Sequence, residues 1–160
     1  MSGFVRRFVG DEGRRVGLFV DGPNVFRTEF DVDLDDVRAA AAERGRLTHA
    51  RLYVDERATA GLIQAAEAHG FRVVTTSGDV DVKLAVDATA AVADGAIDVL
   101  AIASRDMDFK PVLETAAERG VRTLAIAPGD YGRSDALPST AHEAVTLGPS
   151  GSFESSESSE

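Results

Sequence analysis

The sequence predicts an α/β fold with a parallel sheet and crossover helices. From Val16 onward, short runs rich in β-branched and aliphatic residues alternate regularly with longer stretches of helical character. A glycine follows each of four helical stretches, where helices commonly end in a residue with left-handed backbone conformation. These glycines are Gly45, Gly70, Gly95 and Gly120. The two regularities together indicate successive β-α units.

The expected elements follow one another in a simple order. Each predicted strand is short and mainly apolar, as a strand buried in a parallel sheet should be. The strands are Val16–Val20, His49–Val54, Phe71–Thr75, Ile97–Ala103 and Arg122–Ala127, with a last short strand near Ala144–Leu147 after the loop PGDYGRSDALPST. The helices between them are Leu34–Arg44, Ala58–His69, Val80–Ala93 and Phe109–Arg119.

A chain of 160 residues has the ordinary size of one domain and can bury a core. We expect that domain at residues 16–148. Residues 1–15 form an N-terminal basic segment that carries four arginines. Residues 149–160 lack apolar content, and we predict a disordered acidic Ser/Glu tail there.

The net charge is -10, which would ordinarily argue against a polyanionic partner, because Lys and Arg neutralise phosphates in such complexes. The basic residues are 15 Arg and 2 Lys, against 27 Asp and Glu, a bias typical of proteins kept soluble in concentrated salt. We interpret it as the surface of a halophile. Charges are screened within about 3 Å at 1 M salt, so the global charge then says little about partners. An acidic mesophilic protein from a high-GC genome is the alternative.

The chain contains no cysteine, which excludes a disulfide framework and a thiolate zinc site and fits a reducing cytoplasm. No apolar stretch approaches the roughly 18 residues of a membrane span, and the N-terminus has no apolar signal core. We therefore expect a soluble, cytoplasmic protein without a membrane partner.

Asp21 follows the apolar run VGLFV and precedes Gly22, so its side chain should emerge at the carboxyl end of the first strand. Ligands bind at that edge of an open α/β sheet. Asn24 adds a carboxamide in the sequence DGPN, and carboxylate and amide oxygens can hold a hydrated Mg²⁺. A turn or helix-capping role for Asp21 is the alternative.

Two further aspartates lie on the helix predicted from Val80. At 100° per residue, Asp81 falls within the apolar arc of that helix, where an unpaired carboxylate needs a partner or a cation. A first-turn carboxylate favoured by the helix dipole is the alternative. Asp87 lies about 120° further round, and it either supports a metal site or pairs with Lys83 one turn earlier.

Ser104, Asp106 and Asp108 follow the strand IDVLAIA and precede the helix that starts near Phe109. Capping of that helix explains one of the three. Several oxygen donors within five residues also make a plausible metal site, and the helix N-terminus offers N–H groups to a phosphate.

Taken together, DGPN, VDVKLAVD and SRDMDF resemble the NYN domain family, in its short archaeal type, which is similar to PIN-domain nucleases. The resemblance covers residues 16–148. It implies a three-layer α/β/α, PIN-like (Rossmannoid) fold with parallel strand order 3-2-1-4-5. Asp21 and the segment 104–108 then become neighbours, with the third helix beside them. Because PIN-like proteins often dimerise, the resemblance also suggests a homodimer.

The resemblance further implies a catalytic site. The acidic positions that match those holding Mg²⁺ or Mn²⁺ for RNA cleavage are Asp21, Asp81, Asp106 and Asp108, with Asn24 and Ser104 as supporting groups. The metal would polarise the scissile phosphate and activate a water for in-line hydrolysis. Arg105 stands where a glycine is common, and it either grips a phosphate or crowds the site.

The leading hypothesis is thus a metal-dependent ribonuclease. The basic residues expected to contact phosphates are Arg27, Lys83, Arg105 and Lys110, for which solvated surface charge is the alternative. A non-catalytic RNA-binding or regulatory domain is the second hypothesis. A phosphotransfer module is a third, but the first strand ends in a single Asp rather than in an acidic pair.

Overall fold

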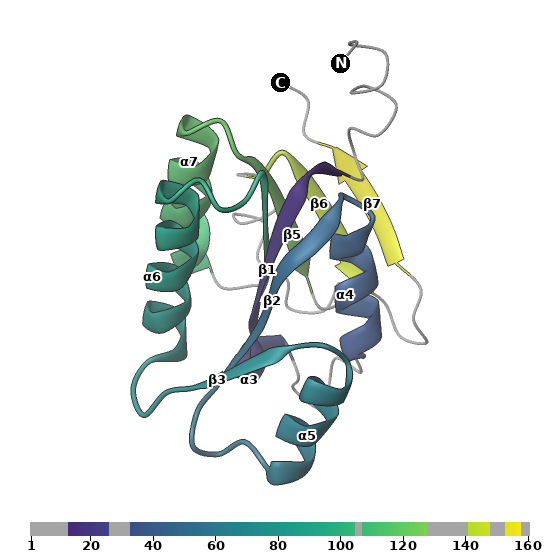
Figure 1. Ribbon diagram of the computed structural model, residues 1–160, viewed down its shortest axis with the longest axis vertical. Coiled ribbons are helices and arrows are strands. Elements are labelled where there is room, and N and C mark those ends of the chain that lie inside the picture. Colours follow the sequence, from purple (N-terminus) through teal and green to yellow (C-terminus); the bar gives the residue numbers. More distant parts are fainter. Residues whose placement is uncertain (1–12, 26–32, 105–106, 128–140, 148–152, 158–160) are drawn as a thin grey trace.

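A twisted sheet lies at the centre of the structure, with helices on both of its faces (Figure 1). The structure is a computed structural model, and it describes residues 13–25, 33–104, 107–127, 141–147 and 153–157. The strands are β1 (Arg15–Asp21), β2 (Arg46–Val54), β3 (Arg72–Thr75), β4 (Val99–Ala103), β5 (Arg122–Ala127), β6 (Glu143–Leu147) and β7 (Phe153–Glu157). The helices are α3 (Gly22–Val25), α4 (Leu34–Ala42), α5 (Ala60–Ala68), α6 (Val80–Ala93), the 3-10 helix η1 (Met107–Phe109) and α7 (Lys110–Glu118).

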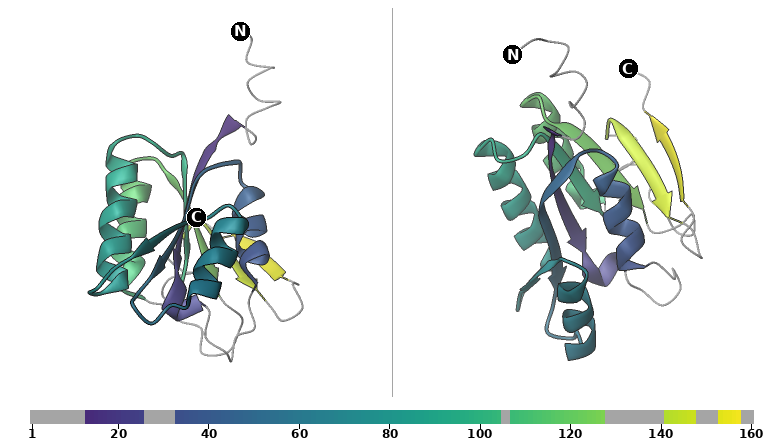
Figure 2. Two further views of the ribbon diagram at one scale, coloured as in Figure 1. Left: turned by 60° about the horizontal axis from the view of Figure 1, so that its bottom comes forward. Right: turned by 45° about the vertical axis from the view of Figure 1, so that its right-hand side comes forward.

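The strand order is β3-β2-β1-β4-β5-β6-β7. β1 to β6 pair in parallel, and β7 pairs antiparallel with β6. Helices α6 and α7 cover one face of the sheet and α4 and α5 the other, as Figure 2 shows. The predicted α/β/α architecture and the strand order 3-2-1-4-5 are confirmed, and β6 and β7 extend that order.

Most predicted elements differ from the observed ones only at their ends, and α6 and β5 match to the residue. The largest difference is at β2, which begins at Arg46 instead of His49. The first half of this strand is only partly buried, so its residues RLTH lack the apolar run that was used to define the strand. It forms because β1 offers a parallel partner from Arg15 onward. All four predicted helix-ending glycines have positive φ.

The C-terminal segment contains the strand β7, where the sequence predicted a disordered tail. Its residues Phe153–Glu157 pair with Leu147–Glu143 of β6. Strand pairing satisfies backbone groups and does not require apolar side chains on both faces of an antiparallel edge. The prediction considered only side-chain composition, and for this segment it was wrong. The N-terminal basic segment falls largely outside the described residues.

The two faces of β1 belong to two separate hydrophobic cores. Val16, Leu18 and Val20 pack towards α4 and α5. Phe19 packs towards α6 and α7. Because side chains alternate along a strand, Asp21 continues the set that contains Phe19 and lies on the α6 side of the sheet. Among the residues described, no helix combines the length and the apolar content that crossing a membrane requires.

Candidate functional site

Asp21 and Ser104 meet at the carboxyl edge of the two central strands. β1 and β4 pair in parallel up to Val20 and Ala103, so the residues that follow them lie side by side. The Ser104 hydroxyl donates a hydrogen bond of 3.3 Å to Oδ2 of Asp21. Both side chains are buried, with 5% of Asp21 and 1% of Ser104 exposed. The carboxyl ends of β1 and β4 therefore lie side by side, as predicted.

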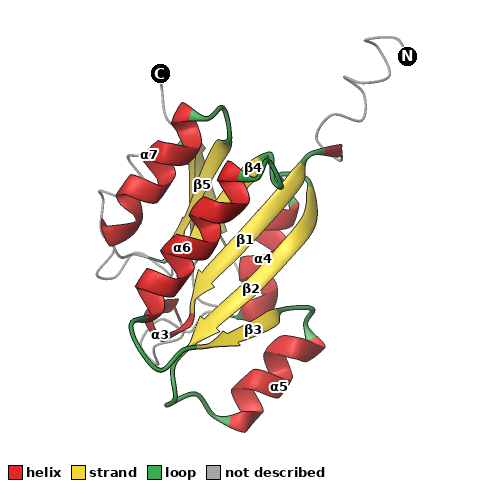
Figure 3. Ribbon diagram, turned by 60° about the vertical axis from the view of Figure 1, so that its left-hand side comes forward, coloured by secondary structure: helices red, strands yellow, loops and turns green. Residues whose placement is uncertain are grey.

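The chain turns directly after Asp21, and Gly22 makes this turn possible. A Cβ atom at Gly22 would lie 2.6 Å from the carbonyl oxygen of Tyr53, which is closer than real Cβ atoms approach. The absence of a side chain lets α3 start against the end of β2. Figure 3 shows α3 at the carboxyl end of β1, below α6. Asp21 is thus the last strand residue, held between a buried strand and a tight turn.

Asp81 lies in the first turn of α6, and α6 begins at the same edge of the sheet. The side chain is half-buried, and its Oδ1 accepts a 3.0 Å hydrogen bond from the backbone N–H of Val82. The buried face of α6 contains Val80 and Leu84, so Asp81 lies at the margin of this face. Val82 is exposed, so the opposite face meets solvent.

Asp87 takes part in a different network. The Tyr53 hydroxyl donates a 2.8 Å hydrogen bond to Oδ2 of Asp87. The Lys83 ammonium lies 3.2 Å from the other oxygen of Asp87, and a guanidinium nitrogen of Arg51 lies 3.8 Å from Oδ2. The ion pair with Lys83 is thus the alternative that the structure supports. Asp87 is six residues after Asp81, about 9 Å further along the helix axis.

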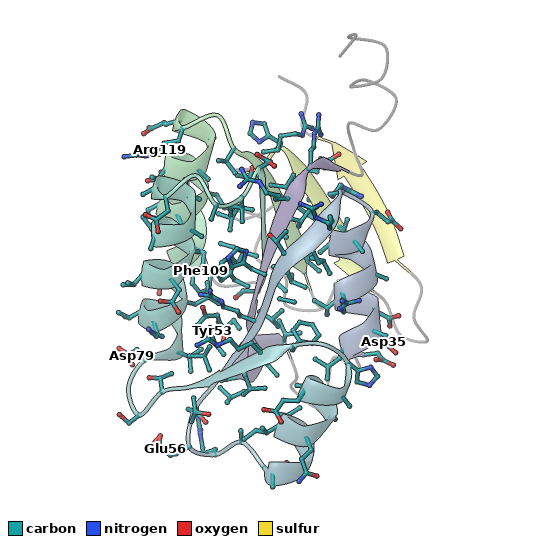
Figure 4. All side chains as sticks on the ribbon, viewed as in Figure 1. Asp35, Tyr53, Glu56, Asp79, Phe109 and Arg119 are labelled. Carbon is teal, nitrogen blue, oxygen red and sulfur yellow. The ribbon has the colours of Figure 1, made fainter. Side chains whose placement is uncertain are left out.

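Sequence reasoning missed Tyr53 and Arg51 as partners of Asp87. Figure 4 shows Tyr53 between the sheet and α6, and burial, followed by the hydrogen bond to Asp87, raises the pKa of its hydroxyl far above the usual range. The guanidinium of Arg51 lies 5.7 Å from the centre of the Phe19 ring, a cation–π distance. The contacts with Asp87 join β2 to α6, whereas the contact of Arg51 with Phe19 joins β2 to β1. Both depend on how the elements pack against one another.

The segment after β4 is described in part. Asp108 is exposed in η1, and Lys110 is exposed at the first position of α7. The N-cap residue of α7 is Phe109, whose side chain makes no capping hydrogen bond, and the capping role predicted for one of Ser104, Asp106 and Asp108 stays a prediction. The other predicted residues (Asp106, Arg105, Arg27 and the side chain of Asn24) lie outside the described part and stay predictions.

A complete metal-binding cluster is not formed by the described residues alone. Within residues 13–25, 33–104, 107–127, 141–147 and 153–157, no three His, Cys, Asp or Glu side chains lie close enough to hold one ion. The structure brings Asp21 together with Ser104, whereas Asp81 and Asp108 lie on flanking elements. The predicted group of four carboxylates includes Asp106, which the structure does not describe.

A cavity of about 320 Å³ opens beside this edge on the α5 side of the sheet. It begins at Gly22, the residue after Asp21, and the sequence analysis did not single it out. The residues that line it are Gly22, Pro23, Val54, Asp55, Arg57, Ala58 and Leu62. One signal in the sequence pointed to it, because Asp55 directly follows the apolar end of β2, at the same edge of the sheet where β1 ends in Asp21.

Comparison with known proteins agrees with the fold and the motifs. An uncharacterized protein of Methanocaldococcus jannaschii is 40% identical over 134 residues, which make up 84% of this chain and 55% of that protein. The chain thus spans about half the length of this curated relative. The crystal structure of a protein of unknown function from Vibrio parahaemolyticus aligns with a TM-score of 0.74 and 19% identity, and the alignment covers 90% of this chain and 98% of that one. At this identity the likeness concerns the fold alone.

The family model of the NYN domain matches residues 15–148, which include β1, α6, β4 and the edge where Asp21 meets Ser104. The chain belongs to the NYN domain family, a family of PIN-like nucleases.

Proposed function

We propose that this protein is a metal-dependent ribonuclease that hydrolyses phosphodiester bonds of RNA at the carboxyl edge of β1 and β4. The observation that carries the proposal is the buried Asp21 carboxylate, hydrogen-bonded to Ser104 where the two central strands end. Ligands of open α/β sheets bind at this edge, and membership of a PIN-like nuclease family favours phosphodiester chemistry there.

The donor atoms at this edge suit a hard cation. Asp21 and Ser104 offer only oxygen atoms, which Mg²⁺ and Mn²⁺ prefer, and Mg²⁺ keeps several waters when it binds to few protein groups. In this proposal Asp21 is the central ligand. The remaining acidic ligands in this proposal are Asp81 on α6, Asp106 before η1 and Asp108 in η1, with Asn24 in a supporting position.

Each residue of the edge then has a separate role in the reaction. When bound, the metal polarises the scissile phosphate and activates a water for attack. Ser104 holds the Asp21 carboxylate in one orientation through its hydroxyl. Lys110 and the N-terminus of α7 bring positive charge to the phosphate, and Arg27 and Arg105 are the further phosphate contacts that we expect. Lys83 contributes least, since it already pairs with Asp87.

Cleavage of end-labelled RNA tests the proposal. In 2 to 3 M KCl (roughly the salt range implied by the acidic surface), the wild type should cleave with Mg²⁺ or Mn²⁺ and stop in EDTA. Asp21→Asn should lose this cleavage. The control Asp94→Asn changes an exposed aspartate at the other end of α6 and should cleave normally. Equal cleavage by Asp21→Asn and the wild type would refute the assignment.

A non-catalytic RNA-binding domain is the second candidate. The observation that favours it is that the described residues hold no cluster of three metal-binding side chains. This function predicts RNA binding that neither EDTA nor Asp21→Asn alters, without turnover at any metal concentration. We further propose that the protein acts in the cytoplasm, in concentrated salt, and that it forms a homodimer. Sedimentation at high KCl would test the homodimer.

A further inference from the structure

The cavity beside Asp21 has the walls of a site for a flat, partly apolar group. Val54 is 2% exposed and belongs to the core, and Leu62 packs against that core from α5. Ala58 and Pro23 complete the apolar lining. Its volume of about 320 Å³ is at the lower end of the range for small-molecule sites, roughly 300–1,000 Å³.

One carboxylate lies in this apolar lining. The Asp55 side chain is 13% exposed and the Arg57 side chain is 83% exposed. Nε and Nη2 of Arg57 lie 3.3 Å and 2.8 Å from Oδ2 of Asp55. The backbone N–H of Arg57 donates a 2.9 Å bond to Oδ1. These hydrogen bonds lower the pKa of Asp55, which therefore stays ionised at neutral pH.

The guanidinium of Arg57 is the more easily displaced partner, since it lies almost wholly in solvent. An exposed ion pair of this kind contributes little to stability, so a ligand with similar donors can replace it at small cost. Both guanidinium contacts go to Oδ2, while Oδ1 accepts from the backbone N–H of Arg57. A ligand that replaces the guanidinium must therefore present two neighbouring N–H groups, as Nε and Nη2 of Arg57 do. A phosphate does not fit inside the cavity, because Asp55 would repel it.

Among the four RNA bases, only guanine has this pattern on its pairing edge, where N1–H and N2–H₂ are adjacent donors. Adenine and cytosine present one amino group beside a ring-nitrogen acceptor, and uracil presents one N–H between two carbonyl oxygens. A carboxylate beside an acceptor is repelled, so these three bases leave Asp55 with at most one good hydrogen bond.

We propose that this cavity binds a guanine base of the RNA, with Asp55 accepting its N1–H and N2–H groups and Arg57 swinging out towards the adjacent phosphate. The proposal rests on the ribonuclease function above and names its substrate specificity. Gly22 lines the cavity and directly follows Asp21, so the bound base would lie on the α5 side of the same sheet edge, in a nucleotide near the cleaved bond.

Binding in EDTA tests the cavity separately from catalysis. The probes are fluorescein-labelled oligouridylates that carry one central guanosine, inosine or adenosine, measured by fluorescence anisotropy with the wild type. The guanosine probe should bind about 10-fold more tightly than the adenosine probe, the discrimination expected of a bidentate contact. The inosine probe, which lacks N2, should lie between them.

Two variants localise the effect. Asp55→Asn keeps an oxygen for the backbone N–H of Arg57 but removes the charge, and it should abolish the preference for guanosine. Ala58→Leu fills the cavity and should do the same, whereas Ala65→Leu adds the same atoms at an exposed position of α5 and should behave as wild type. Thermal unfolding of each variant checks that it is folded.

Equal affinity for the guanosine and adenosine probes would overturn the proposal, as would a preference that survives both Asp55→Asn and Ala58→Leu in folded protein. Cleavage assays with Mn²⁺ separate the two proposals. Metal-dependent cleavage without a guanosine preference would leave the nuclease assignment intact and refute only the cavity proposal. A guanosine preference without cleavage at any metal concentration would support the cavity and refute the nuclease.

Discussion

The amino and carboxyl edges of the sheet both carry charged residues, but they use these residues differently. At the amino edge, Arg15 holds Asp98 through its backbone N–H and two guanidinium nitrogens at 2.8 to 3.1 Å. At the same edge, Nε of Arg44 lies 2.6 Å from Oε1 of Glu143. At the carboxyl edge, the contact that defines Asp21 comes from a neutral hydroxyl. Arginine pairs thus join separate elements at the amino edge, whereas at the carboxyl edge Asp55 pairs with Arg57, two residues further along the chain, and Asp21 accepts a hydrogen bond from Ser104.

The largest expected effect concerns Asp21 and Asp98 as a matched pair. Asp21→Asn should reduce RNA cleavage by a factor on the order of 100 or more while the protein stays folded. Asp98→Asn should leave cleavage unchanged and lower the Tm by a few degrees, because it breaks the contacts that join β1 to the start of β4. Cleavage rates and thermal unfolding of both variants give the comparison. The reverse pattern would show that the amino edge is the functional one.

Alanine substitutions at Gly22 and Gly13 compare how tightly the chain is packed at the two ends of β1. Gly22→Ala places a Cβ 2.6 Å from a backbone oxygen, and the backbone shift that relieves this clash should cost about 1–3 kcal/mol of unfolding free energy. Gly13→Ala, just before β1, meets nothing within 4 Å and should change stability by less than about 0.5 kcal/mol. Urea unfolding measures both. A large effect at Gly13 with none at Gly22 would contradict the described turn.

The smallest expected effect is a pH dependence at the amino edge. The hydrogen bonds from Arg15 hold the pKa of Asp98 below its usual range. A group with a lowered pKa in the folded protein stabilises it above the unfolded-state pKa, near 3.9, and this contribution is lost as pH falls further. Asp98→Asn should therefore lose less stability than the wild type between about pH 5 and pH 3. Parallel Tm curves in this interval would disprove the contribution.

Sequence periodicity predicted the fold well because each central strand and helix buries a regular apolar face. It located α6 to the residue. The strand order that places Asp21 beside Ser104 came from the family resemblance and not from periodicity. Such patterns hold within one element. The hydrogen bond of Tyr53 with Asp87 joins β2 to α6, so it depends on how the helix packs on the sheet, which periodicity within one element does not encode.

Two further features escaped the sequence analysis for other reasons. β7 forms through backbone pairing, to which side-chain composition is a poor guide. The cavity at Asp55 depends on Gly22, Val54 and Leu62, which come from three separate elements. The convergence of Asp81, Asp106 and Asp108 on Asp21 came from the family resemblance, and it stays a prediction because Asp106 lies outside the described residues.

The position of β1, paired on one side with β2 and on the other with β4, limits motion at the carboxyl edge of the sheet. The amide protons of this strand point alternately towards β2 and β4, and either neighbour separates only when the central sheet opens, so their exchange should follow global unfolding. Asp21 is the last residue of this strand, so its backbone is held in place by the same pairing. Under the proposed function, a substrate would therefore meet a carboxylate whose position the sheet already fixes.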